Sequence, residues 1–71
     1  MRGNRRGKGP GRLIRALRIH RGLSIRALAQ KASVAAGYIS ELENGRKADP
    51  GLDVLRRLAR ALGAPLSDLI E

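Results

Sequence analysis

Apolar residues recur at intervals of three and four along most of this chain, a spacing that places them on one face of an α-helix. The clearest stretch is residues 51–62, where the repeating apolar positions are Leu52, Leu55, Leu58, Ala59 and Leu62. A second such face, near the start of the chain, comprises Leu13, Ile14 and Leu17. Together with residues that start or stop helices, the pattern predicts five helices: residues 11–21, 24–32, 35–43, 51–62 and 65–70.

Serine, glycine and proline define the expected ends of these helices. Ser24 has a side chain that can accept a hydrogen bond from the free amides at the start of the second helix. Gly22, Gly45 and Gly63 each follow a periodic stretch, and glycine readily closes a helix. Pro65 can open the short last helix.

The predicted helices are too short to be stable alone in water, so their apolar faces must share one core. The chain has 71 residues, no Phe and no Trp, and Tyr38 is its one aromatic residue. The core must therefore be aliphatic, and the chain is too short for a second domain. We predict an all-α fold, with one compact five-helix domain over residues 11–71.

Basic residues are concentrated in the first part of the chain. Residues 1–31 contain ten Lys and Arg residues and no acidic residue, whereas all six acidic residues follow Ser40. The net charge is +9 and the pI is about 11.7. This distribution favours a polyanionic partner, of which nucleic acid is the commonest. A charged surface that only keeps the protein soluble is the alternative.

The first ten residues mix basic side chains with glycine and proline, a composition too polar to bury anything. We therefore expect residues 1–10 to form a disordered basic arm. Its four cationic side chains are Arg2, Arg5, Arg6 and Lys8.

Several classes of protein are excluded by what the chain lacks. Cysteine is absent and His20 is the one histidine, so a disulfide framework and a Cys/His zinc site are excluded. No nucleophile with its base and no paired carboxylates are present, so we expect no enzyme, no cofactor and no small-molecule ligand. No apolar run approaches the roughly 20 residues of a membrane span, nor does a signal peptide's apolar segment follow the basic start. We expect a cytoplasmic protein without membrane contact.

Residues 23–45, LSIRALAQKASVAAGYISELENG, predict two short helices joined by a tight turn. A helix-turn-helix places its second helix in the major groove of DNA, while the first crosses the phosphate backbone. Residues 35–43 would then be the recognition helix. Such a pair also occurs in any small helical bundle, so this feature alone indicates little.

Five segments in register extend the pattern from Ile14 to Ile70: IRALRIHRGLS, LAQKASV, YISELENG, P-x-L-x-x-L-x-x-L-A-x-A-L-G and L-x-x-L. In this order they resemble the phage Cro and repressor-like helix-turn-helix family, also called the xenobiotic-response-element (XRE) family. The resemblance implies a sequence-specific DNA-binding domain of five helices. Such domains usually act as dimers on palindromic operators in bacteria or their phages.

The resemblance also assigns roles to individual residues. The base-facing residues it implies are Ala36, Gly37, Ser40 and Glu41. The residues it implies near the DNA backbone are Tyr38, Asn44, Arg46, Lys47 and Arg26. Helical spacing agrees, because the base-facing positions lie opposite the apolar Ile39 and Leu42.

Direct reading of bases by this helix is limited. Ala36 and Gly37 cannot make the bidentate hydrogen bonds with purines that Gln, Asn or Arg make. Ala36 can touch a thymine methyl, Ser40 can bond either base type, and Glu41 can accept from a cytosine amine. We therefore expect part of the specificity to come from groove shape, with the basic arm in a narrow minor groove.

Three positions depart from the family pattern. Ile25 stands where Gln often binds phosphate, so that contact is lost. Ser33 stands at a turn position that is usually Gly, and a left-handed backbone there would cost about 1 kcal/mol or more. Ala35 replaces a Ser or Thr cap, a change that typically costs about 1 kcal/mol.

Other residues have structural interpretations. Arg18 and Glu43 occupy positions where the family has an internal ion pair that links the first helix to the end of the third. The candidate dimer contacts are Pro65, Leu66, Leu69 and Ile70, which alternatively cap the core of the monomer. Arg56, Arg57 and Arg60 form a solvated face, unless they approach DNA or an acidic partner.

The leading hypothesis is a transcriptional regulator, most simply a repressor, that binds double-stranded DNA as a homodimer. The alternative is an adaptor or antitoxin-like helix-turn-helix module whose main partner is another protein. A third hypothesis is loose binding of RNA or an anionic membrane through the arm alone. With one aromatic residue available for base stacking, the chain is a poor candidate for a single-strand binder.

Overall fold

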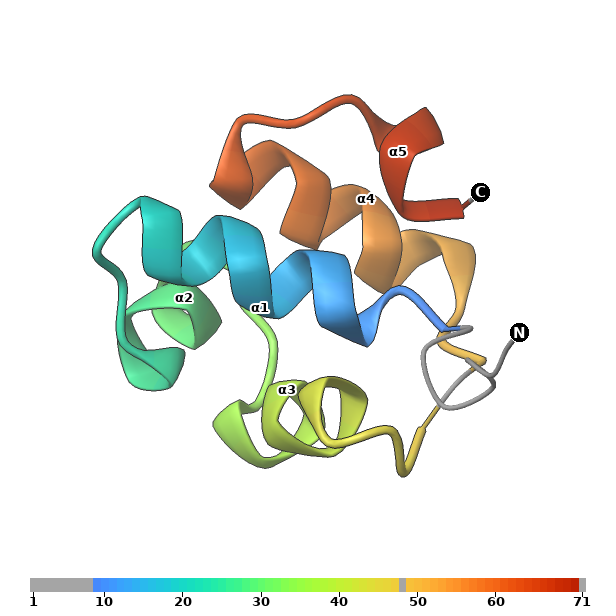
Figure 1. Cartoon of the computed structure of the whole chain (residues 1–71), viewed down its shortest axis with the longest axis horizontal. Coiled ribbons are helices and arrows are strands. Elements are labelled where there is room, and N and C mark those ends of the chain that lie inside the picture. The colour runs from blue at the N-terminus through green and yellow to red at the C-terminus, as the bar shows by residue number, and fades with distance from the viewer. Residues whose placement is uncertain (1–8, 48, 71) are drawn as a thin grey trace.

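The computed structural model describes residues 9–47 and 49–70. Over these ranges it is all-α and contains five helices: α1 Gly11–His20, α2 Ile25–Ala32, α3 Ala36–Glu43, α4 Leu52–Leu62 and α5 Leu66–Ile70 (Figure 1). The predicted helices are confirmed to within one residue at each end. The predicted arm residues Arg2, Arg5, Arg6 and Lys8 lie outside the described residues.

Pro10, which the sequence placed in the arm, belongs to the start of α1. It is the N-cap residue of this helix, and its carbonyl accepts a hydrogen bond from the N–H of Ile14 at 3.0 Å. Proline suits the start of a helix because its φ is already fixed near the helical value. The first helix therefore includes, as its N-cap, one residue that was predicted to belong to the arm.

Helix α4 is the central element of the packing. It contacts α1, α2 and α5, while α3 packs against α1 and α2. In Figure 1, α1 crosses the middle of the molecule between α4 and α3, and α5 folds back over α4. The pair α2 and α3 is thus held from two sides, by α1 and by α4.

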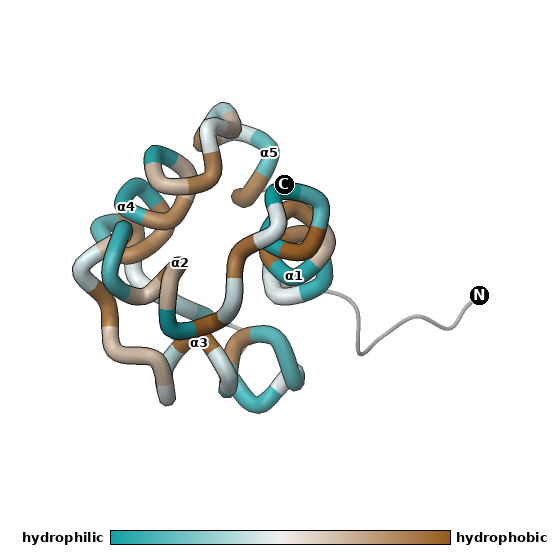
Figure 2. Tube along the Cα trace, turned by 90° about the vertical axis from the view of Figure 1, so that its left-hand side faces the viewer, coloured by the Kyte–Doolittle hydropathy of each residue, from teal (hydrophilic) through white to brown (hydrophobic). Residues whose placement is uncertain are grey.

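The core is aliphatic, as predicted. Six side chains from four helices are fully buried: Ile14, Leu28, Ile39, Leu42, Leu58 and Leu62. Leu69 of α5 is 3% exposed and completes the cluster. Figure 2 shows that the helices mix hydrophobic and hydrophilic residues along their length, as helices that bury one face do.

Gly11 makes the closest approach between α1 and α3. It is buried, and a Cβ atom at this position would lie 2.7 Å from the carbonyl carbon of Leu42 and would overlap the carbonyl oxygen. Only a residue without a side chain fits there, so Gly11 fixes the distance between the two helices. The sequence predicted Gly11 as a helix start but not as a contact.

Helices α1 to α4 end in the same way. In each case a left-handed residue follows the helix: Gly22, Ser33, Gly45 and Gly63. The next residue then donates its N–H to a carbonyl five positions earlier, as Leu23 does to Arg18 at 3.0 Å. This closure satisfies carbonyls that the helix leaves free. Three of the four positions carry the residue that adopts this backbone without strain.

No helix in the described ranges is long and apolar enough to cross a membrane.

Candidate nucleic-acid interface

The turn between α2 and α3 determines how α3 is presented. Ser24 accepts a hydrogen bond from the N–H of Ala27 at 3.0 Å, which confirms the predicted cap at the start of α2. Ser33 ends this helix with φ 57° and ψ 48°, and it is the one non-glycine residue with positive φ in residues 9–47 and 49–70. Such a backbone costs about 1 kcal/mol in a residue with a Cβ. The turn is left-handed at Ser33 even though it has no glycine there.

Arg57 of α4 braces this turn. Its Nη1 donates to the carbonyl of Ser33 at 3.0 Å, and its Nη2 lies 3.3 Å from Oδ2 of Asp53. Arg57 is exposed, as predicted for a solvated face, but its side chain also contacts Ser33 and Asp53. Helical periodicity places Arg57 on the polar face of α4, but only the packing of α4 against α2 brings it to Ser33.

Arg18 and Glu43 form the expected ion pair. The Arg18 Nε and Nη2 atoms donate to the two Glu43 carboxylate oxygens at 2.7 and 2.9 Å, and Nη1 donates to the carbonyl of Leu23 at 2.8 Å. The two side chains are only 12% and 4% exposed. The hydrogen bond to Glu43 raises the pKa of Arg18 although burial opposes this. The pair ties α1 to the loop before α2 and to the end of α3.

The outer side of α3 presents most of the predicted base-facing residues. Gly37 and Glu41 are exposed and Ser40 is half-buried. Ala36 is also half-buried, because it packs against the core cluster. The side of α3 predicted to face the bases is thus exposed at Gly37 and Glu41 but partly buried at Ala36. Ala35, at the N-cap of α3, makes no side-chain capping bond, as its replacement of Ser or Thr predicted.

Polar contacts connect the end of α3 to the loop that follows. The Nζ atom of Lys47 lies 3.8 Å from Oε1 of Glu41 and 5.2 Å from the centre of the Tyr38 ring. Asn44 donates from Nδ2 to Oγ of Ser40 at 3.4 Å. The Tyr38 ring is half-buried against the core, so it covers part of the core edge.

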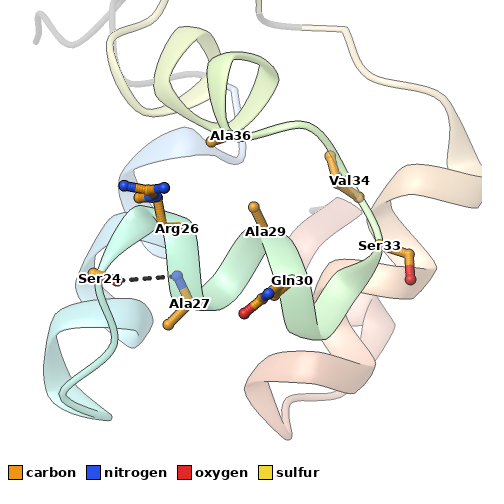
Figure 3. Close-up of a pocket in the computed structure, with 8 residues that line it drawn as sticks. All are labelled: Ser24, Arg26, Ala27, Ala29, Gln30, Ser33, Val34 and Ala36. Atoms are coloured by element: carbon orange, nitrogen blue, oxygen red, sulfur yellow. Dashed lines mark hydrogen bonds between the residues drawn. The ribbon is translucent and has the colours of Figure 1, made fainter.

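A hollow separates α2 from the start of α3 (Figure 3). Its lining residues are Ser24, Arg26, Ala27, Ala29, Gln30, Ser33, Val34 and Ala36. Figure 3 shows Ala29, Val34 and Ala36 between the two segments, with Arg26 extending from α2. The apolar lining consists of small side chains, so this face leaves room for a group to approach the backbone. Arg46 is exposed beyond the other end of α3.

The predicted dimer contacts divide into two groups. Leu69 is buried in the monomer core and Leu66 is half-buried against it, so the capping interpretation applies to both. Leu69 is therefore not available as a dimer contact. Pro65 and Ile70 are exposed, Ile70 by 55%.

Sequence reasoning missed two residues that position this surface, Gly11 and Arg57. Each acts on a segment far from it in the chain, on Leu42 and on Ser33 respectively. For Arg57, the one indication in the sequence was Ser33 at a turn position that is usually glycine, because a strained turn gains from a hydrogen bond to another part of the chain. For Gly11 the sequence held no comparable indication.

Five short helices, a tight turn before an exposed helix and cations on both sides of that helix define a small helix-turn-helix domain. Residues 14–69 match the family model HTH_3, described as helix-turn-helix, and the chain belongs to this family.

Relatives of this chain are named as regulators of transcription. It is 40% identical over 58 residues to the HTH-type transcriptional regulator DdrOP3 of Deinococcus deserti, covering 82% of this chain and 44% of that protein. It is 39% identical over 57 residues to the transcriptional regulator ClgR of Mycobacterium tuberculosis, covering 80% and 50%. The chain thus spans about half the length of these curated relatives.

A solved structure has the same fold. The master regulator for biofilm formation SinR, crystallised in complex with DNA, superposes with a TM-score of 0.84 at 29% identity, covering 87% of this chain and 98% of that one.

Proposed function

We propose that this chain binds double-stranded DNA sequence-specifically, as the DNA-binding part of a transcriptional regulator, with α3 in the major groove. The observation that carries the proposal is the open side of α3, where Gly37, Ser40 and Glu41 lie in a helix-turn-helix. Flanking cations are Arg26, Arg46 and Lys47. Base edges specify a site, whereas such cations neutralise phosphates and set the register. The SinR structure with DNA supports this proposal.

Two polar side chains supply direct base contacts in this arrangement. Ser40 can bond either base type, and Glu41 can accept a hydrogen bond from a cytosine amine. Lys47, 3.8 Å from Glu41, offsets the repulsion between this carboxylate and nearby phosphates. Gly37 and Ala36 add little hydrogen bonding but permit close approach, so groove shape contributes to specificity.

Selection of binding sites from random duplexes with the purified chain tests the proposal. A defined motif is expected, and Glu41→Ala should reduce discrimination at a single C·G pair by about tenfold or more. Arg46→Gln is the matched comparison, because loss of a phosphate contact should weaken all sequences about equally. Enrichment of no motif, or an unchanged base preference in Glu41→Ala, would contradict the proposal.

We further propose that the chain acts as a two-fold dimer and as a repressor in the bacterial cytoplasm. A single recognition helix of eight residues offers little surface for tight binding, and paired half-sites about one helical turn apart double it. The exposed Pro65 and Ile70 are the apolar candidates that remain for the contact. Sedimentation of the chain with its selected duplex should show two chains per site, and Ile70→Glu should favour one.

A second candidate function is a module whose main partner is another protein, with DNA binding secondary. The observation that favours it is the small number of polar side chains on the open side of α3, two of four positions. A stoichiometric protein complex, combined with no motif from the selection, would favour this function over the first.

A further inference from the structure

A second hollow lies outside the proposed DNA-binding surface, between the end of α2 and the C-terminal half of α4. It has a volume of about 270 Å³ and is lined by Lys31, Ala32, Ser33, Arg57 and Arg60. We call it the basic hollow. It shares no residue with the set proposed to contact DNA. Three of its five lining side chains are cations, and none is acidic.

The cations converge because of how the helices pack. Arg57 and Arg60 are three positions apart on α4 and so lie on one face. Lys31 comes from the last turn of α2, which packs against α4. Asp53 pairs with Arg57 and is itself 73% exposed. All three cationic side chains are exposed, so water screens most of their mutual repulsion, and a bound anion would offset what remains.

The lining is suited to a phosphate group. Guanidinium groups present donors in a planar fork that matches phosphate oxygens, and the ammonium group adds a point charge. Lys31 and Arg60 lie in the last turns of α2 and α4, where the helix dipole favours a positive charge. The helix dipole does not require the two side chains to line one hollow. We propose that the basic hollow binds a small phosphate-bearing anion.

An anion bound in the basic hollow would change the contacts that Arg57 makes with the turn between α2 and α3. Arg57 already uses Nη1 to hold the carbonyl of Ser33, and a bound phosphate competes for that donor. Ser33 also lines the hollow between α2 and α3, next to Ala36. Ser33 therefore lines both the basic hollow and the hollow between α2 and α3. Any effect on DNA affinity rests on the proposed function, whereas binding of the anion does not.

Pyrophosphate titrated into the ¹⁵N-labelled free chain tests the proposal, with sodium chloride at matched ionic strength as the reference. Saturable amide shifts confined to Lys31–Val34 and Arg57–Arg60 are expected. Arg60→Gln should weaken binding about tenfold, the cost of one charge-assisted hydrogen bond. The control Arg15→Gln removes the same charge from the exposed side of α1 and should change the affinity less than about twofold.

Four results would overturn the inference. Three are shifts that do not saturate, shifts spread equally over α1, and equal losses of affinity in Arg60→Gln and Arg15→Gln. A fourth is a response to a DNA duplex but not to pyrophosphate at the same amides, which would make the hollow a contact for backbone phosphate. Because the main titration contains no DNA, its failure is distinct from failure of the proposed DNA binding.

Discussion

Arg18 joins three segments of the fold, because it lies on α1 and its three donors reach Glu43 at the end of α3 and the carbonyl of Leu23 before α2. Its guanidinium is largely enclosed, and its pKa is raised by the bond to Glu43. A raised pKa in the folded state means that the associated stabilisation is present at all pH values below the ordinary arginine pKa. It would be lost only as the pH rises through the raised value, so we expect no loss from Arg18 near neutral pH.

Removing the Glu43 charge should therefore destabilise the protein strongly. Glu43→Gln leaves the guanidinium enclosed without its counter-charge, and we expect the free energy of unfolding to fall by about 3 kcal/mol. Urea denaturation measures this loss. The control is Glu41→Gln, which changes the same chemical group at an exposed position 51% open to solvent and should cost less than about 1 kcal/mol. Equal losses in the two variants would refute the structural role of the pair.

Ser33 is the second residue whose effect follows from its own backbone. Ser33→Gly removes the Cβ from a left-handed conformation and should raise the free energy of unfolding by about 0.5–1 kcal/mol, the strain relieved less the entropy of glycine. Ser33→Ala keeps the Cβ, so it should show no comparable gain. Thermal unfolding would resolve the difference, since about 1 kcal/mol shifts the Tm of a domain of this size by roughly 4–8 °C. A gain from alanine equal to that from glycine would contradict the assignment of strain.

At the scale of elements, the sequence predicted the features that depend on residues close together in the chain, which are the positions of the helices and their ends. Periodicity and caps located the helices, since both are local properties, and Ser24 is a clear case. Contacts between distant segments were predicted only for Arg18 and Glu43, through the family resemblance. Arg57 at Ser33, Gly11 at Leu42 and the partial burial of Ala36 could not be predicted, because each depends on the angle and distance at which two helices pack.

The two glycines inside helices, Gly11 and Gly37, differ in whether the packing leaves room for a side chain. Gly11→Ala places a Cβ against the Leu42 carbonyl, a backbone group that cannot rotate away, and should destabilise by about 2 kcal/mol or more. Gly37 has no atom within 4 Å of a Cβ added there, so Gly37→Ala should stabilise α3 by about 0.5–1 kcal/mol. Chemical denaturation of both variants checks the prediction. Destabilisation by both, or by neither, would contradict the packing of α1 on α3.

At the scale of the whole molecule, the charge of the chain predicted the kind of partner but not the surface that binds it. The excess of cations indicated a polyanionic partner, but the sequence alone did not separate the surfaces that carry them. Apart from Arg18 in its ion pair and Arg56 on α4, the cations of the described residues lie on the flanks of α3, on the exposed side of α1 or at the basic hollow. Only the first set is proposed to contact DNA, so removing the same charge at different places should have different effects.

The salt dependence of DNA binding tests this division. If about six phosphates are contacted, log K should fall by roughly five for each tenfold rise in salt, because binding releases condensed counterions. Arg46→Gln should reduce this slope by about one, since it removes one phosphate contact. Arg15→Gln lowers the net charge equally from the exposed side of α1 and should leave the slope nearly unchanged. Equal reductions would mean that the chain responds to DNA through its total charge, and the proposed orientation of α3 would then have no electrostatic support.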